Sequence, residues 1–185
     1  MIHPLLRMGH PLLRQRARLL TEADLRTPAF AQFVDDMREC MKHYGGIGLA
    51  APQIGQPLQL AVIELEGGKN RYGSELGLPY TVFINPEIEV LDPAEQGFWE
   101  GCLSVPGLRG FVERPRKVRV RYLDVTGAAQ ELVAEDFLAT VVQHELDHLT
   151  GHLYVDRIKD TRLLSFQEEF AQFYGQAPSL DEEDV

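Results

Sequence analysis

Apolar positions recur at helical spacing over residues 28–44, which predicts the first long helix. Thr27 can cap its first turn, and Pro28 suits the first helical position, where the helix needs no N–H. Gly45 can end the helix in the left-handed conformation. Cys40 is expected to be an ordinary core residue, as free cysteines often are. The predicted buried stripe consists of Phe30, Phe33, Val34, Met37, Cys40, Met41 and Tyr44.

Two further helices are predicted nearer the C-terminus. One begins at residue 135 or 136 and runs to 150, with Gly151 placed to end it. The other covers 160–174 and starts at Asp160. Its apolar stripe would consist of Leu163, Phe166, Phe170 and Phe173.

The middle of the chain has short β-branched and aromatic runs, which are typical of strands. In the last of them Val118, Val120 and Tyr122 alternate with basic residues, which predicts one buried face and one solvated face. Residues 66–79 are polar and are expected to form a loop. The predicted strands are residues 58–65, 80–85, 87–92 and 116–124.

Because strands and helices do not alternate regularly, the order of elements predicts an α+β fold instead of a doubly wound one. We expect antiparallel β-sheets packed around a central helix over 135–150, with an N-terminal helix and a C-terminal helix. The 185 residues are predicted to form one domain over 1–175. Residues 176–185 are acidic and are expected to form a disordered tail.

Composition limits the function classes. The formal net charge is −10, so the chain has no general attraction for phosphate backbones, and no direct nucleic-acid binding is expected. No run of about 18 apolar residues occurs, so no membrane span is expected. Since the N-terminus lacks the features of a secretory signal, Cys40 and Cys102 are expected to be reduced in a cytoplasm.

Candidate metal ligands lie on the second predicted helix, in the stretch QHELDHLTGH. His144 and His148 are four residues apart, so both project from one side of the helix. Phe137 and Val141 fall on that side too, which would place an ion against apolar surface. Glu145 follows the first histidine and could approach a water at the ion without being a ligand. Hydrogen-bonded core histidines are the alternative interpretation.

Two other segments carry residues suited to a site. Cys102 lies in WEGCLSVPG, at the end of a predicted strand, and a thiolate with two imidazoles leaves an open position for water. A buried apolar thiol is the alternative for this residue. The stretch GGIGLAAPQIG, residues 45–55, lets backbone approach a ligand closely, and Gln53 offers an amide donor near its end. A tight loop without a function is the alternative there.

Together the three segments resemble the peptide deformylase family. Its motifs are matched, in the family's order, by GIGLAAPQ at 46–53, EGCLS at 100–104 and HELDHLTG at 144–151. The resemblance implies a metal-dependent hydrolase of protein biosynthesis. Its substrate would be the N-terminal formyl group of formylmethionyl nascent peptides, which it would release as formate. The location implied is a bacterial cytoplasm, with an organelle as the alternative.

The resemblance also implies the metal centre. The ligands would be Cys102, His144 and His148, with a water in the fourth place. One Fe²⁺ per chain is the expected ion, and Zn²⁺, Ni²⁺ or Co²⁺ could occupy the same ligands. Glu145 would act as general base and then as general acid.

Further site residues follow from the same resemblance. The side-chain amide of Gln53 and the backbone N–H of Leu103 would stabilise the oxyanion. The backbone of Ile47, Gly48 and Gly101 would pair with an extended peptide like an added strand.

The surroundings of the site are expected to hold the substrate and the ligands. Phe137 and Val141, from their helical spacing, would form part of the pocket for the methionine side chain, with plain core residues as the alternative. Arg109 is expected near the peptide, where family members often carry an arginine, and a surface arginine is the alternative. Asp147 and Glu100 are expected to orient neighbouring groups instead of binding metal.

Two rival functions stay open on the sequence. A general HExxH metallopeptidase would cleave inside an unformylated chain, but such enzymes usually recruit a ligand further downstream. A non-catalytic metal-binding module would close its site with a fourth protein ligand, for which His152 is the nearest candidate. Transient ribosome contact is a further partner to consider, but it is disfavoured through the C-terminal end because Arg162 is the only cation in 160–185.

Overall fold

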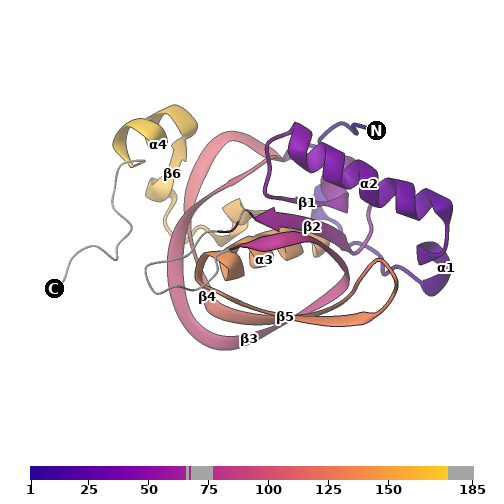
Figure 1. Ribbon diagram of the computed structural model, residues 1–185. Coiled ribbons are helices and arrows are strands. Elements are labelled where there is room, and N and C mark those ends of the chain that lie inside the picture. The colour runs from indigo at the N-terminus through magenta and orange to yellow at the C-terminus, as the bar shows by residue number, and fades with distance from the viewer. Residues whose placement is uncertain (66, 68–76, 175–185) are drawn as a thin grey trace.

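The computed structural model describes residues 1–65, 67 and 77–174. Figure 1 shows helix α3 inside the curve formed by the long strands β3 and β4, with β1 and β2 between α3 and α2. The predicted α+β class with a central helix is confirmed. In chain order the helices and strands are α1 (Glu22–Leu25), α2 (Pro28–His43), β1 (Gly48–Ala50), β2 (Leu60–Leu65), β3 (Leu78–Cys102), β4 (Val105–Leu123), β5 (Ala129–Glu135), α3 (Asp136–Leu149), β6 (Leu164–Phe166) and α4 (Gln167–Phe173).

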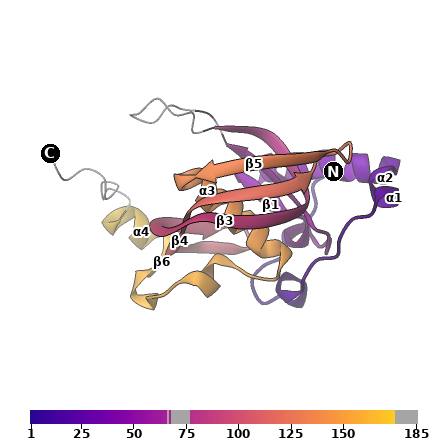
Figure 2. The ribbon, with the colours of Figure 1, turned by 90° about the horizontal axis from the view of Figure 1, so that it is seen from below.

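The described strands form one antiparallel sheet in the order β1-β2-β3-β4-β5, and β6 pairs with β4. Strands β3 and β4 pair along most of their length, as Figure 2 shows, and register shifts that begin after Ile84 bend the hairpin. The predicted runs 80–85 and 87–92 are therefore parts of one strand, β3. The antiparallel prediction is confirmed, although the strands form one sheet instead of several.

Strand β2 has a helix on each face, which explains its unbroken apolar run. Leu60 and Val62 belong to the core that α2 covers, whereas Ala61 and Ile63 belong to the core that α3 covers. All four side chains are fully buried. The two cores hold β1, the neighbour of β2, firmly beside α3.

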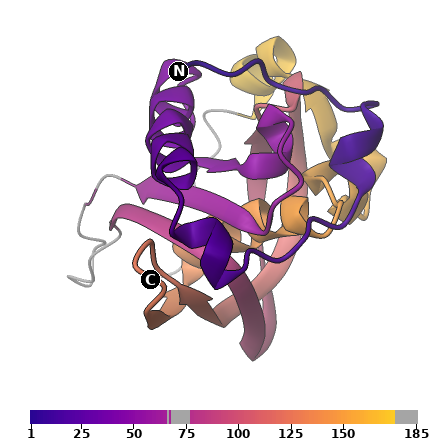
Figure 3. The same cartoon turned by 90° about the vertical axis from the view of Figure 1, so that its right-hand side faces the viewer.

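The N-terminal segment crosses from the end of α2 to the opposite side of the molecule before the chain turns back toward α1 (Figure 3). Two backbone hydrogen bonds fix it on the way. Leu6 N–H donates to Gln53 O at 2.8 Å, and Met8 N–H donates to Ser104 O at 2.7 Å. Residues 6–8 therefore lie against two of the motifs.

Helix α2 begins and ends where the sequence predicts. The Thr27 hydroxyl accepts a hydrogen bond from Phe30 N–H at 3.1 Å, and Gly45 has φ 70°. Cys40 is fully buried in the core beneath this helix, as expected.

Helix α3 confirms the second predicted helix. It packs against β1, β2 and β4, so most of its residues are buried. Gly151 follows it with φ 81°, and a side chain there would also meet the backbone of Arg14 at 2.7 Å. The histidines on α3 are thereby held in a rigid setting.

The third predicted helix is shorter than expected, and its start at Asp160 was wrong. Residues 161–163 form a 3-10 turn that Asp160 caps, Leu164–Phe166 form β6, and only Gln167–Phe173 are α-helical. Pairing of β6 with residues 108–110 of β4 overrides the local helical pattern.

The stripe predicted for this helix is also not a core face. Phe166 and Phe173 are each 67% exposed, while Phe170 packs on Trp99 with 5.1 Å between ring centroids. The loop predicted over 66–79 falls mostly outside the described residues, as does the tail over 176–185. No helix in the described part of the chain is long and apolar enough to cross a membrane.

Candidate metal centre

A pocket of about 800 Å³ opens beside the edge of β1, the turn that joins β3 to β4, and helix α3. His148 lies deeper and is fully buried. The predicted site residues that line the pocket are Ile47, Gly48, Gln53, Gly101, Cys102, Leu103, Arg109, Phe137, Val141, His144 and Glu145.

Cys102, His144 and His148 come together at the inner end of this pocket. Their candidate ligand atoms all lie within 4.8 Å of one another, and Cys102 Sγ is 3.4 Å from His148 Nε2. The histidines share one face of α3, and Cys102 is the last residue of β3. Across the described residues, no further His, Cys, Asp or Glu joins the group. A closed structural site would require such a fourth protein ligand.

The pKa values of the two rings are shifted in opposite directions by their surroundings. Burial, with the nearby His144, lowers the pKa of His148 well below its usual value, so the ring is neutral near pH 7 and one of its nitrogens carries a lone pair. Burial also lowers the pKa of His144, but interactions with Cys102 and Glu100 outweigh it and raise that pKa to about 10. The surroundings of His144 thus favour positive charge, which a cation on this thiolate and imidazole set would supply.

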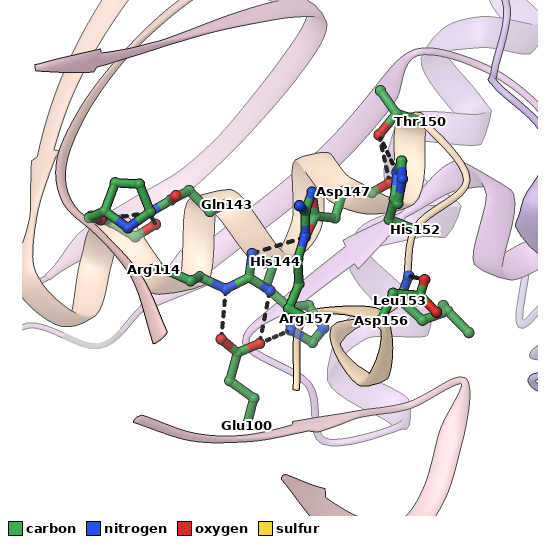
Figure 4. Close-up of polar contacts among 12 residues, drawn as sticks. Glu100, Arg114, Gln143, His144, Asp147, Thr150, His152, Leu153, Asp156 and Arg157 are labelled. Carbon is green, nitrogen blue, oxygen red and sulfur yellow. Dashed lines mark hydrogen bonds and ion pairs between the residues drawn. The ribbon is translucent and has the colours of Figure 1, made fainter. Parts of the chain in front are cut away.

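Glu100 fixes the orientation of His144. Its Oε2 lies 2.7 Å from His144 Nδ1, which leaves Nε2 to face the pocket. Arg114 donates from Nε to Oε1 at 2.6 Å and from Nη2 to Oε2 at 3.0 Å (Figure 4). Burial alone would raise the pKa of Glu100, but the hydrogen bonds from His144 and Arg114 hold it below its usual value.

Arg114 connects both acidic residues that were expected to support the site. Its Nη1 donates to Asp147 Oδ2 at 2.8 Å, and Arg157 Nη2 donates to Asp147 Oδ1 at 2.7 Å (Figure 4). Arg114 is only 4% exposed. Arg114 was not singled out from the sequence, because it lies before the predicted strand 116–124. The one available signal was that the motif carboxylates Glu100 and Asp147 had no predicted cationic partner.

Glu145 is buried beside the candidate ligands. It is 6% exposed, and its Oε2 has no hydrogen-bond partner within the described part of the chain. Burial raises the pKa of Glu145 to about 7. A carboxyl group that titrates near neutrality can accept and return a proton. Its side chain lies against Gly48, where a Cβ would come within 2.5 Å of Glu145 Cδ.

Gln53 points its amide nitrogen at the cysteine. Its Oε1 accepts from Ala50 N–H at 2.8 Å, while Nε2 lies 3.2 Å from Ser104 Oγ and 3.5 Å from Cys102 Sγ. Ser104 is a fully buried motif residue to which the sequence assigned no role. Leu103 lies between Cys102 and Ser104, in the turn from β3 to β4.

The peptide-pairing residues lie on backbone that has room for another strand. Strand β1 lies at one edge of the sheet, so among the described strands only β2 pairs with it. An extended peptide can add to such an edge. Ile47 and Gly48 lie at this edge, and Gly101 lines the same pocket. The Arg109 guanidinium packs on Gly101, where an added Cβ would be 2.7 Å from Arg109 Cζ.

Phe137 and Val141 both line the pocket from α3. Phe137 is 38% exposed and packs edge-on against Phe98 with 5.5 Å between centroids. Val141 is buried in the core between α3 and the sheet. The structure therefore places both side chains where an apolar substrate group could contact them.

Known proteins share this arrangement. The family model described as "Polypeptide deformylase" matches residues 2–163. Peptide deformylase from Leptospira biflexa is 44% identical over 168 residues, 91% of this chain and 94% of that protein. Peptide deformylase 1 from Bordetella pertussis is 46% identical over the same shares.

Solved structures agree with the curated relatives. The Met-Ala-Ser-bound class I type b peptide deformylase from Acinetobacter baumannii has a TM-score of 0.78 at 35% identity, over 85% of this chain and 99% of that one. A peptide deformylase from Synechococcus elongatus in complex with actinonin has a TM-score of 0.76 at 39% identity, over 95% and 87% of the two chains. From its sequence, its fold and its Cys/His/His centre, the chain belongs to the polypeptide deformylase family.

Proposed function

We propose that the pocket removes the formyl group from N-formylmethionyl ends of nascent peptides and releases formate. One observation carries the proposal. The sulfur of Cys102 and the imidazoles of His144 and His148 converge at the inner end of a peptide-sized pocket, with the carboxyl group of Glu145 beside them. The Met-Ala-Ser peptide in the Acinetobacter baumannii relative supports a substrate that begins with methionine. Bacterial relatives support a bacterial cytoplasm as the location.

Cys102, His144 and His148 would hold one divalent cation per chain. Fe²⁺ is the ion that we expect first, and Zn²⁺, Ni²⁺ or Co²⁺ could replace it on the same ligands. When bound, such a cation polarises a carbonyl group and makes a water nucleophile available near neutral pH. The low pKa of His148 supports this ligand role, because a ligating imidazole must be neutral.

The protein side chains would move the protons and stabilise charge. Glu145 accepts a proton from the attacking water and returns it to the departing amine, for which a pKa of about 7 is well suited. Gln53 Nε2 and the Leu103 N–H donate to the formyl oxygen as negative charge develops there. The bond from Ala50 N–H to Gln53 Oε1 keeps that amide from rotating.

The substrate backbone would lie along β1. Ile47 and Gly48 offer the free strand edge, and Gly101 offers backbone from the β3 side. The methionine side chain would then contact Phe137 and Val141 on α3. Only the formyl end of the peptide reaches the inner end of the pocket in this arrangement.

A paired assay tests the proposed function. Metal-loaded protein is incubated with formyl-Met-Ala-Ser and, separately, with Met-Ala-Ser. We expect formate and a free amine in equal amounts from the first peptide and no cleavage of the second. Cleavage inside the unformylated peptide would support the metallopeptidase instead, and no reaction with either peptide would support the non-catalytic module.

Replacing Gly48 by alanine should damage the reaction without removing the metal ligands. A Cβ at this position would overlap the buried Glu145 side chain at Cγ, Cδ and Oε1, so that side chain would have to shift. Displacement of a reacting group by about 1 Å can cost roughly 10²-fold, so kcat/KM should fall by about that factor. Formate release and metal content measure the two effects separately.

A Glu145→Ala background, in which the side chain ends at Cβ, provides the control. The atoms from Cγ outward that a Cβ on Gly48 would overlap are then gone, so Gly48→Ala should lower the residual rate much less than it lowers the wild-type rate. An equal loss in both backgrounds would show that Gly48 acts independently of Glu145.

A further inference from the structure

The pocket carries two arginines that have no anionic partner in the described part of the protein. Most described arginines form ion pairs with carboxylates, as expected for a chain with net charge −10. Within the described residues, Arg7, Arg16 and Arg109 form none. Arg7 and Arg109 line the pocket, and Arg16 does not.

Arg7 is held at the pocket by its backbone. The residues on either side of it are fixed, because Leu6 N–H donates to Gln53 O and Met8 N–H donates to Ser104 O. Both acceptors belong to the motifs that build the metal centre. The exposed Arg7 side chain therefore stays beside the pocket without an ion pair to a described residue.

Arg109 is held from the other side. Its backbone pairs with Ser165 of β6, and its Nε donates to Gln167 Oε1 at 2.6 Å. The structure records no acceptor among the described residues for Nη1 or Nη2, so these nitrogens keep their N–H donors. The guanidinium lies on Gly101, beside the backbone with which the peptide would pair.

The carboxylates of the pocket do not cancel this charge. Glu100 forms hydrogen bonds with Arg114 and His144 at the metal end, which is the inner end of the pocket. Glu145 is buried beside the candidate ligands, also at the metal end. Arg7 and Arg109 thus add positive charge to the pocket, outside its metal end, in a protein whose net charge is −10.

We propose that Arg7 and Arg109 together select substrates with a carboxylate downstream of the formylmethionine, on the second or third residue. The inference rests on the proposed function, because it assigns the part of the peptide that extends beyond the methionine. A carboxylate satisfies the free guanidinium donors and gains from the uncompensated charge, whereas a lysine is repelled. Gln167 is a positioning residue here, since it holds Arg109 by its Nε.

The test compares kcat/KM for formyl-Met peptide amides that differ only by Glu, Gln or Lys at the second or third residue. The amide removes the terminal carboxylate, and a free-acid peptide in parallel shows whether that group can take the same place. The Glu to Gln ratio should be roughly 3- to 10-fold at one of the two positions, and it should shrink at high salt. The Lys peptide should be the slowest.

The variants assign the effect to residues. Arg7→Gln combined with Arg109→Gln should bring the Glu to Gln ratio to about 1, whatever happens to the overall rate. Arg16→Gln removes the same charge from the same segment away from the pocket, so it should leave the ratio and the rate unchanged. A ratio near 1 in the wild type, or a ratio that survives the double variant or falls equally in Arg16→Gln, overturns the inference. If no formylated peptide reacts, the proposed function fails as well.

Discussion

Replacing Glu145 by glutamine is expected to lower kcat/KM for a formyl-Met peptide by about 10²- to 10⁴-fold, the range that general acid–base catalysis supplies. Glutamine fills the same space against Gly48 but cannot accept the proton of the water or return one to the amine. Because Glu145 is not among the three candidate ligands, the variant should keep its metal. Formate release and metal analysis on the same preparation measure both results.

Glu113→Gln is a matched control for Glu145. Glu113 is an exposed carboxylate on β4 that pairs with Lys159, and it does not line the pocket. Its replacement should leave the rate unchanged. If the Glu145 variant kept more than about a tenth of the wild-type rate with full metal content, another group would have to carry the proton.

Replacing Arg114 by methionine is expected to cause the largest loss of stability of any single change near the site. It leaves the buried carboxylate of Glu100 and the partly buried carboxylate of Asp147 without their shared cation. Removing one partner of a buried ion pair costs about 3–5 kcal/mol. For a chain of this size the Tm should fall by roughly 6–20 °C. Metal affinity should also fall, by about 10- to 100-fold, because Glu100 would hold His144 less firmly.

Arg157→Met separates this effect from a simple loss of charge. Arg157 also pairs with Asp147, but nearly half of its side chain is exposed. Its loss should lower the free energy of unfolding by less than about 1 kcal/mol. Urea unfolding of both variants at matched metal content measures the difference. Equal losses in the free energy of unfolding would mean that the burial of Arg114 does not make its ion pairs more important for stability than those of Arg157.

The sequence predicted the candidate metal ligands better than the residues that hold them in place. His144 and His148 were identified as candidates from their spacing and Cys102 from its motif, the family resemblance implied that the three act together as ligands, and they lie together. Their convergence requires the fold, since it depends on β3 ending beside α3. Arg114 could not be found in this way, because nothing next to it in the chain marks a strand position as buried and charged.

Local pattern also failed where pairing between distant segments decides the structure. Residues 160–174 have helical spacing, but Leu164–Phe166 gain backbone hydrogen bonds as a strand on β4. The bent hairpin of β3 and β4 was missed for a related reason. Its register shifts depend on the partner strand and leave little trace in either strand alone.

X-ray absorption spectroscopy on anaerobically prepared protein tests the metal centre most directly. Metal analysis should give one divalent ion per chain, and the spectrum should show one sulfur together with lighter atoms from imidazole and solvent in the first coordination shell. Cys102→Ala should remove the sulfur signal. A metal-loaded wild type without sulfur in that shell, or with a fourth protein ligand in place of solvent, would contradict the account.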